Sequence, residues 1–244
     1  MKPYFKFKGI NSKDLQLTIT RLPQRIIPEL RGEKIIIPGK NGFLFESENA
    51  YNSKILEIEC TFNAPQNFSK DEIDALIMQI PTWLNGKGQL ILSDYPDYFY
   101  EAKVINAIGI DRLFKRYRRF LLEIDVQPFS ESIEEKVITK TTSEEEIINI
   151  ETYFDTYPVI EVTGNGNFSI TVNNETLHFK DILNKITIDS KLLIATENDG
   201  LNNASNKLYG KYPILKPGEN IISSLTKNES TIQKIEIKYR GTWI

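Results

Sequence analysis

Side chains that could perform acid–base or nucleophilic chemistry are scarce in this sequence and stand apart from one another. His178 is the single histidine; it has apolar neighbours on both sides, and the sequence places no acid to orient it. Cys60 is the single cysteine and lies in an alternating apolar segment typical of a buried strand. Because hydrolytic catalysis by histidine needs a nucleophile and an orienting acid, we expect a structural or surface role for His178, a buried position for Cys60, and no enzymatic activity.

Metal and phosphate sites have little support either. One histidine and one cysteine cannot form the ligand cluster of a structural zinc site. A carboxylate-only calcium site around Asp189, Glu197 and Asp199 stays open, although no loop has the ligand spacing of an EF-hand. The glycine segments 164–166 and 39–42 resemble phosphate loops, but each leads into a strand pattern rather than a helix, so we interpret both as hairpin turns. A carboxylate-based glycosidase also stays open, but no pair among the 33 acidic residues is singled out. We expect no cofactor.

One basic cluster could suggest a nucleic-acid-binding stripe. It contains Arg112, Lys115, Arg116, Arg118 and Arg119, with Phe114 and Tyr117 interleaved. The whole chain nevertheless carries a formal net charge of −3, whereas a protein that wraps nucleic acid needs many cations to displace phosphate counterions. The cluster runs directly into a strand pattern. We therefore favour the exposed end of a hairpin that contacts a protein neighbour, with nucleic-acid binding as the weaker alternative.

Strand patterns dominate the elements that must position these residues. Branched and alternating apolar segments predict strands at 4–8, 14–20, 34–38, 42–46, 54–63, 88–93, 98–109 and 113–127, and then at 158–162, 167–172, 175–179, 185–188, 191–197, 219–225 and 231–240. One helix is predicted to begin at Ser69, which forms a capping-box pattern with Glu72 ahead of an apolar stripe. Pro81 should kink or restart this helix, and Gly86 should end it. The sequence therefore predicts a mainly β protein with one helix.

Two domains are predicted, at 1–130 and 150–244. The linker between them is placed at 131–149, where the apolar pattern gives way to Ser, Thr, Glu and Lys. With 244 residues, 40% of them hydrophobic, the chain can bury one or two globular cores. Regular short strands in the second half are typical of a β-sandwich or jelly roll. No segment has the pattern of a signal peptide or of a membrane span, so we expect no membrane partner.

Several segments, taken in their order along the chain, resemble the distal tail protein family (Dit), the hub at the tail tip of long-tailed bacteriophages. They are the F-x-G-x-x-S opening at 7–15, the Pro-Gly-x-x-Gly hairpin at 37–42, the stretch 83–104, the exit strand at 126–129, and the segments 157–164, 188–190 and 212–220. The family often has Cys or an aromatic residue before the proline that ends the first domain, where this chain has Val126-Gln127. The resemblance covers nearly the whole chain.

The resemblance implies an N-terminal ring-forming domain, sandwich-like or barrel-like, with one helix. It also implies a C-terminal β-sandwich similar to galectins and carbohydrate-binding modules. The implied role is structural and lies at the virion tail tip. There a homo-oligomeric ring, commonly a hexamer, joins the tail tube protein to tape-measure-associated tip proteins and to receptor-binding proteins. The alternative function is a carbohydrate-binding module that recognises glycans of the host cell wall.

An apolar hairpin at 35–45 is the main candidate for the ring contact. It is apolar on both sides of both predicted strands, with Ile35 and Ile37 on one face and Ile36 on the other, so a further layer must cover it. That layer could be the protein's own helix or second sheet, or a neighbouring subunit. The ring-interface candidates are Ile36, Phe43, Phe45, Arg116, Arg118 and Arg119. The candidates for stacking on sugar rings are Tyr209, Tyr212 and Trp243.

Overall fold

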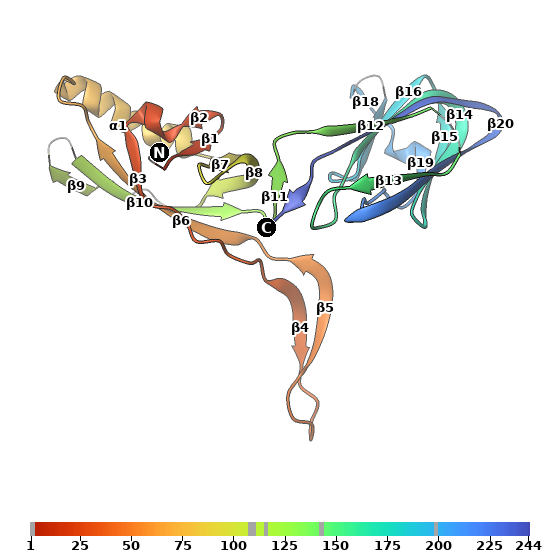
Figure 1. Ribbon diagram of the computed structural model, residues 1–244, viewed down its shortest axis with the longest axis horizontal. Coiled ribbons are helices and arrows are strands. Elements are labelled where there is room, and N and C mark those ends of the chain that lie inside the picture. Colours follow the sequence, from red (N-terminus) through yellow and green to blue (C-terminus); the bar gives the residue numbers. More distant parts are fainter. Residues whose placement is uncertain (1–2, 107–110, 115–116, 142–143, 198–199) are drawn as a thin grey trace. The chain divides into compact units, whose positions relative to one another are not determined.

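The computed structural model describes residues 3–106, 111–114, 117–141, 144–197 and 200–244. The chain divides into two compact units, Met1–Glu131 with Ile244, and Ser132–Trp243. Both units are built from β-strands, and the described residues contain one α-helix (Figure 1). This confirms the predicted fold class of a mainly β protein with a single helix. No helix in the described ranges has both the length and the apolar character needed to cross a membrane.

An antiparallel sheet forms the body of the first unit, with the strand order β2-β1-β7-β8-β10-β6-β3 and with β9 paired to β10. The strands are β1 (Phe5–Phe7), β2 (Ile10–Asn11), β3 (Leu17–Arg21), β6 (Lys54–Asn63), β7 (Lys87–Leu92), β8 (Tyr95–Val104), β9 (Asp111–Phe114), β10 (Tyr117–Val126) and β11 (Ser130–Ser132), and the 3-10 helix η1 (Ser12–Leu15) precedes β3. Strands β6 and β10 alternate between buried apolar and more exposed residues over much of their length. One face of the sheet therefore supplies the core.

The helix α1 (Lys70–Leu84) packs its apolar stripe into this core. Its capping box is confirmed: Glu72 N donates to Ser69 Oγ at 3.3 Å, and Ser69 N donates to the Glu72 carboxylate at 2.7 Å. The helix runs unbroken through Pro81, so the expected restart does not occur, and Gly86 follows its end with a φ of +85°. At the last turn Trp83 stacks on Phe5, with ring centroids 5.4 Å apart, and donates from Nε1 to a carbonyl of β1. The last turn is thereby fixed to the edge of the sheet.

A separate two-stranded ribbon projects from the first unit (Figure 1). Its strands are β4 (Leu30–Ile35) and β5 (Leu44–Tyr51), and residues 36–43 form the connecting loop; we call residues 30–51 the arm. The strands expected at 34–38 and 42–46 are corrected: the loop takes residues 36–38 and 42–43, and the strands lie further from the tip, at 30–35 and 44–51. Pro38 has no N–H for a ladder, and Gly39 and Gly42 have φ values of +80° and +85°. The hydrogen bond from Lys40 N to Ile37 O at 3.1 Å closes a turn there.

A nine-stranded antiparallel sheet forms the second unit, with the order β12-β20-β14-β16-β17-β18; β13 also pairs with β20, β15 with β14, and β19 with β15. The strands are β12 (Lys136–Lys140), β13 (Glu146–Ile150), β14 (Val159–Val172), β15 (Glu175–Ile182), β16 (Lys185–Asp189), β17 (Ile194–Glu197), β18 (Asn202–Asn203), β19 (Leu208–Gly210) and β20 (Gly218–Tyr239), with the 3-10 helix η2 (Ser205–Lys207) before β19 and β21 (Thr242–Trp243) near the end of the chain. The long strands β14 and β20 pair side by side and organise the core.

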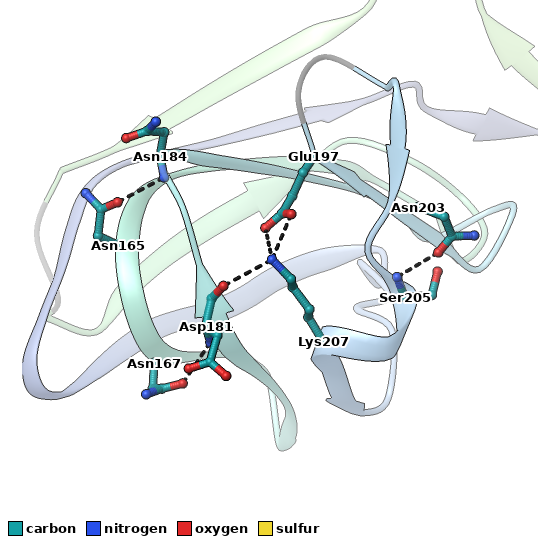
Figure 2. Close-up of polar contacts among 8 residues, drawn as sticks. All are labelled: Asn165, Asn167, Asp181, Asn184, Glu197, Asn203, Ser205 and Lys207. Carbon is teal, nitrogen blue, oxygen red and sulfur yellow. Dashed lines mark hydrogen bonds and ion pairs between the residues drawn. The ribbon is translucent and has the colours of Figure 1, made fainter.

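The segment 164–166 is not the hairpin turn that its sequence suggests. It lies within β14, where the pairing with β20 shifts register twice, so it is a bulge. A Cβ on Gly164 would lie 2.3 Å from the Thr231 carbonyl oxygen of β20. Asn165 and Asn167 accept hydrogen bonds from Asn184 N and Asp181 N, which fixes the turn between β15 and β16 (Figure 2). The glycine therefore serves a close backbone approach, and the asparagines brace a neighbouring turn.

Residues 131–149, expected to be a linker, carry two strands of the second unit. β12 pairs with the end of β20 and β13 with its beginning. Ile148 and Ile150 are buried in the core, and the buried amine of Lys140 donates to the Glu144 carbonyl and to the Glu146 carboxylate. The sequence did not predict these strands because the segment is rich in Ser, Thr, Glu and Lys. In the structure the polar residues of β12 and β13 lie on the open face of the sheet or are paired.

We predict that Gly164→Ala destabilises the second unit. The new methyl group would meet backbone atoms of β20, which cannot move aside, and overpacking of this kind costs about 1–3 kcal/mol. Gly88→Ala is the matched comparison, because its Cβ would meet side-chain atoms, Lys8 Cγ at 2.4 Å and Phe7 Cε2 at 3.4 Å, and no backbone atom lies closer, so we expect a smaller loss. Urea denaturation followed by circular dichroism measures both. Equal effects of the two substitutions would contradict the close-approach explanation.

Candidate functional site

The single cysteine and histidine have no catalytic setting in the structure. Cys60 is buried in β6, and burial raises the pKa of its thiol to about 12. A thiol with this pKa is inert, since the thiolate is the nucleophile. His178 lies on β15 and stacks on Tyr209 of β19. Both residues therefore take the buried-strand and surface positions expected from the sequence.

The carboxylates of the possible calcium site are not brought together. Asp189 and Glu197 stand at opposite ends of the β16–β17 pair, since Asp189 pairs with Ile194 and Glu197 pairs with Ile186. Asp189 Oδ1 accepts from the backbone N–H groups of the following turn. Both Glu197 oxygens accept from Lys207 Nζ at 2.8 Å (Figure 2). Asp199 lies outside the described residues, and within the described ranges no group of three or more His, Cys, Asp or Glu side chains could hold a metal.

The three candidate sugar-stacking aromatics have different surroundings. Tyr209 is 79% exposed and stacks on His178 with centroids 6.0 Å apart. Tyr212 is half-buried against the core of the second unit. Trp243 is half-buried and makes an edge contact with Tyr153 at 4.7 Å. Of the three, Tyr209 alone offers an open ring face.

The basic cluster is described only in part. Arg119 on β10 pairs with the carboxylate of Glu59 on the neighbouring strand β6. The backbone of Arg118 pairs with Phe62 of the same strand, and its side chain is outside the described part. Arg116 lies outside the described residues altogether. Arg119, the member of the cluster whose side chain is described, thus forms a cross-strand ion pair.

The arm is the apolar surface that stands out in the described part of the first unit. Every residue from Glu29 to Glu46 is exposed, including Ile36 at 78% and Phe43 at 59%. Phe45 lies across Gly32, where no Cβ could fit, and Lys34 Nζ lies 5.0 Å from the centroid of the Phe43 ring. Among the described residues of the first unit, neither α1 nor the sheet covers the arm. A neighbouring subunit stays a candidate for the covering layer.

The base of the arm is fixed to the body of the first unit. Lys54 at the start of β6 is buried, and its Nζ donates to the Ile26 carbonyl at 3.1 Å and lies 4.8 Å from the ring centroid of Tyr100. Burial, and after it the positive charge of the nearby Arg25 guanidinium, lower the pKa of Lys54 to about 8. Arg25 itself lies over the Tyr95 ring at 4.5 Å. The segment that enters the arm is therefore held on the sheet by buried polar and cation–π contacts.

A groove of about 510 Å³ lies on the outer face of the same sheet. It is lined by Arg21, Leu22, Pro23, Gln24, Ile26, Ile55, Glu57, Glu59, Leu121 and Glu123. Its apolar side chains Ile55 and Leu121 are 49% and 42% exposed. Glu57 of β6 stands directly opposite Glu123 of β10. The groove therefore combines an apolar surface with three carboxylates, and Arg21 is the one basic residue in its lining.

The described residues thus form two β units, an exposed apolar arm and an open groove, and no cluster of metal-binding side chains occurs among them. Comparisons with known proteins give matches to a family model and to a solved structure. Residues 10–126 match the family model of the phage tail protein RIFT-related domain. The whole chain is similar to the crystal structure of the SPP1 Dit protein, described as a paradigm of the hub adsorption apparatus in phages that infect Gram-positive bacteria. The two share 12% identity and a TM-score of 0.80 over 100% of both chains.

A comparison of the sequence with curated proteins found no match. The family match lies within the first unit, and the match to a solved structure extends over both units. From end to end its fold is that of a distal tail protein.

We predict that stability rises with pH between about 8 and 10.5 because of Lys54. Its folded-state pKa of about 8 lies below the ordinary value of 10.5, so the unfolded chain binds the proton more tightly and folding gains stability as pH rises through this window. Lys54→Met should flatten the rise, whereas Lys70→Met at an exposed position should not. Urea midpoints at a series of pH values provide the test. Parallel pH curves for wild type and Lys54→Met would contradict it.

Proposed function

We propose that the protein assembles into a homo-oligomeric ring at the tail tip, and that the arm supplies part of the contact between subunits. The observation that carries this proposal is the exposure of both faces of the arm. Full burial of one large apolar side chain stabilises by about 1.5–3 kcal/mol. Contiguous exposed apolar surface on a soluble protein marks an interaction site. In this proposal, a second subunit covers the apolar side chains of the arm.

The wider role follows from the likeness to distal tail proteins. In this proposal the ring contains six copies and joins the tail tube protein to tape-measure-associated tip proteins and to receptor-binding proteins. The RIFT-related first unit forms the ring, and the second unit is a galectin-like module that offers surface to the other components. No catalytic step is part of this function.

We predict that Ile36→Asp prevents ring assembly and leaves the fold intact. Ile36 is 78% exposed in the loop of the arm, so a charge there costs little in the monomer but must be desolvated in an interface. Leu201→Asp is the matched control, because Leu201 is 85% exposed in the second unit. Circular dichroism checks folding, and light scattering at high protein concentration measures mass. Rings that persist in both Ile36→Asp and Phe43→Asp would contradict the role of the arm.

Glycan binding by the second unit is a second candidate function. The stacked pair of His178 and Tyr209 favours it, because the pair presents a supported aromatic face to solvent. Binding to purified cell walls of the host should fall about tenfold in Tyr209→Ala, equivalent to the loss of about 1.4 kcal/mol. Tyr153→Ala removes an aromatic ring that is 71% exposed and serves as the control. Unchanged binding in Tyr209→Ala would remove this candidate.

A further inference from the structure

The lining of the groove on the first unit has more acidic than basic side chains: Glu57, Glu59 and Glu123 against Arg21 alone. Glu57 and Glu123 are directly opposed across β6 and β10, and like charges in this position repel each other. Among the described side chains neither carboxylate has a cationic partner, whereas nearby Glu59 is paired with Arg119. Ile55 and Leu121 lie beside this pair and remain substantially exposed. An occupant with a positive charge would offset the repulsion between the two carboxylates, and its apolar side chains would cover Ile55 and Leu121.

The tip of the arm, residues 36–43, has the complementary chemistry. It presents Ile36, Ile37 and Phe43, and Lys40 is its one charged residue. The turn at residues 37–40 places Lys40 at the end of the loop, where it is exposed. One cation among large apolar side chains matches two opposed carboxylates beside two apolar side chains. The tip of the same chain's arm is itself exposed, so it does not fill its own groove.

We propose that the tip of the arm binds in this groove on the next copy of the chain, with Lys40 against Glu57 and Glu123. The inference rests on the proposed ring function and names the mating surface for the arm. Arm and groove are different surfaces of the same unit, so the contact is heterologous: each copy uses its arm toward one neighbour and its groove toward the other. A contact of this kind closes into a ring when its rotation allows. The groove thus determines which neighbour the arm recognises.

Reversal of charge tests the pairing. Lys40→Glu should raise the concentration needed for half-maximal assembly at least about tenfold, since like-charge contacts suppress association. The double substitution Glu57→Lys with Glu123→Lys should raise this concentration by a similar factor. Combining all three substitutions should restore assembly to within about threefold of wild type, because the interaction is a property of the pair. Lys70→Glu, an exposed reversal elsewhere in the first unit, is the control and should have no effect. Circular dichroism confirms that each variant is folded.

Cross-linking tests the geometry independently. Lys40→Cys and Leu121→Cys proteins, mixed and treated with a short bis-maleimide, should yield covalent dimers that neither protein gives alone. The native Cys60 does not interfere, since it is buried. A chain with both substitutions should give a ladder that ends at the closed ring.

The outcomes separate this inference from the proposed function. Wild-type rings together with normal assembly of Lys40→Glu, or without the mixed cross-link, would overturn the groove assignment and leave the ring intact. A wild-type protein that stays monomeric at high concentration would instead refute the ring, and the groove assignment with it.

Discussion

A two-stranded ribbon has two faces and no interior, and this constraint governs how the chain can work. In the two sheet-based units the inward side chains cover one another, as in the cluster of Phe5, Phe7 and Trp83. The arm has no such option, because within the described residues its strands pair with each other alone. Its apolar side chains can be buried only by something that comes from outside the described fold. An isolated hairpin is marginal in water, so the arm also depends on how firmly its base is held.

The base of the arm is therefore built more like a core than like a loop. Lys54 donates to the entering segment at Ile26, and Tyr51 at the end of β5 makes an edge contact with Phe129 at 5.0 Å. Burying an amine disfavours its charged form, which is the physical cause of the lowered pKa of Lys54. A hydrophobic residue there would avoid that cost, but it could not satisfy the Ile26 carbonyl. The buried amine of Lys54 thus lowers the stability of this site, while its hydrogen bond to the Ile26 carbonyl holds the segment that leads into the arm.

Local signals in the sequence predicted elements that depend on neighbours along the chain. The capping box at Ser69 and Glu72 and the end of the helix near Gly86 are found as expected, because both are settled within one turn. The burial of Cys60 followed from simple alternation. The segment 164–166 shows the limit: glycine is needed there because β20 approaches closely, and no local rule separates that need from a turn. The strands β12 and β13 were missed because their partner lies about 70–100 residues away, at β20.

The same limit applies to the candidate site. The apolar character of residues 35–45 was visible in the sequence, but its exposure was not, because exposure depends on whether the rest of the unit reaches it. The groove gives no sequence signal at all: Glu57 and Glu123 lie in ordinary alternating strands, and only the register of β6 with β10 makes them face each other. A repulsive pair on an open sheet face lowers the stability of the monomer slightly. A neighbouring copy that brings a cation to this pair and covers Ile55 and Leu121 would remove the repulsion and bury the apolar surface in one contact.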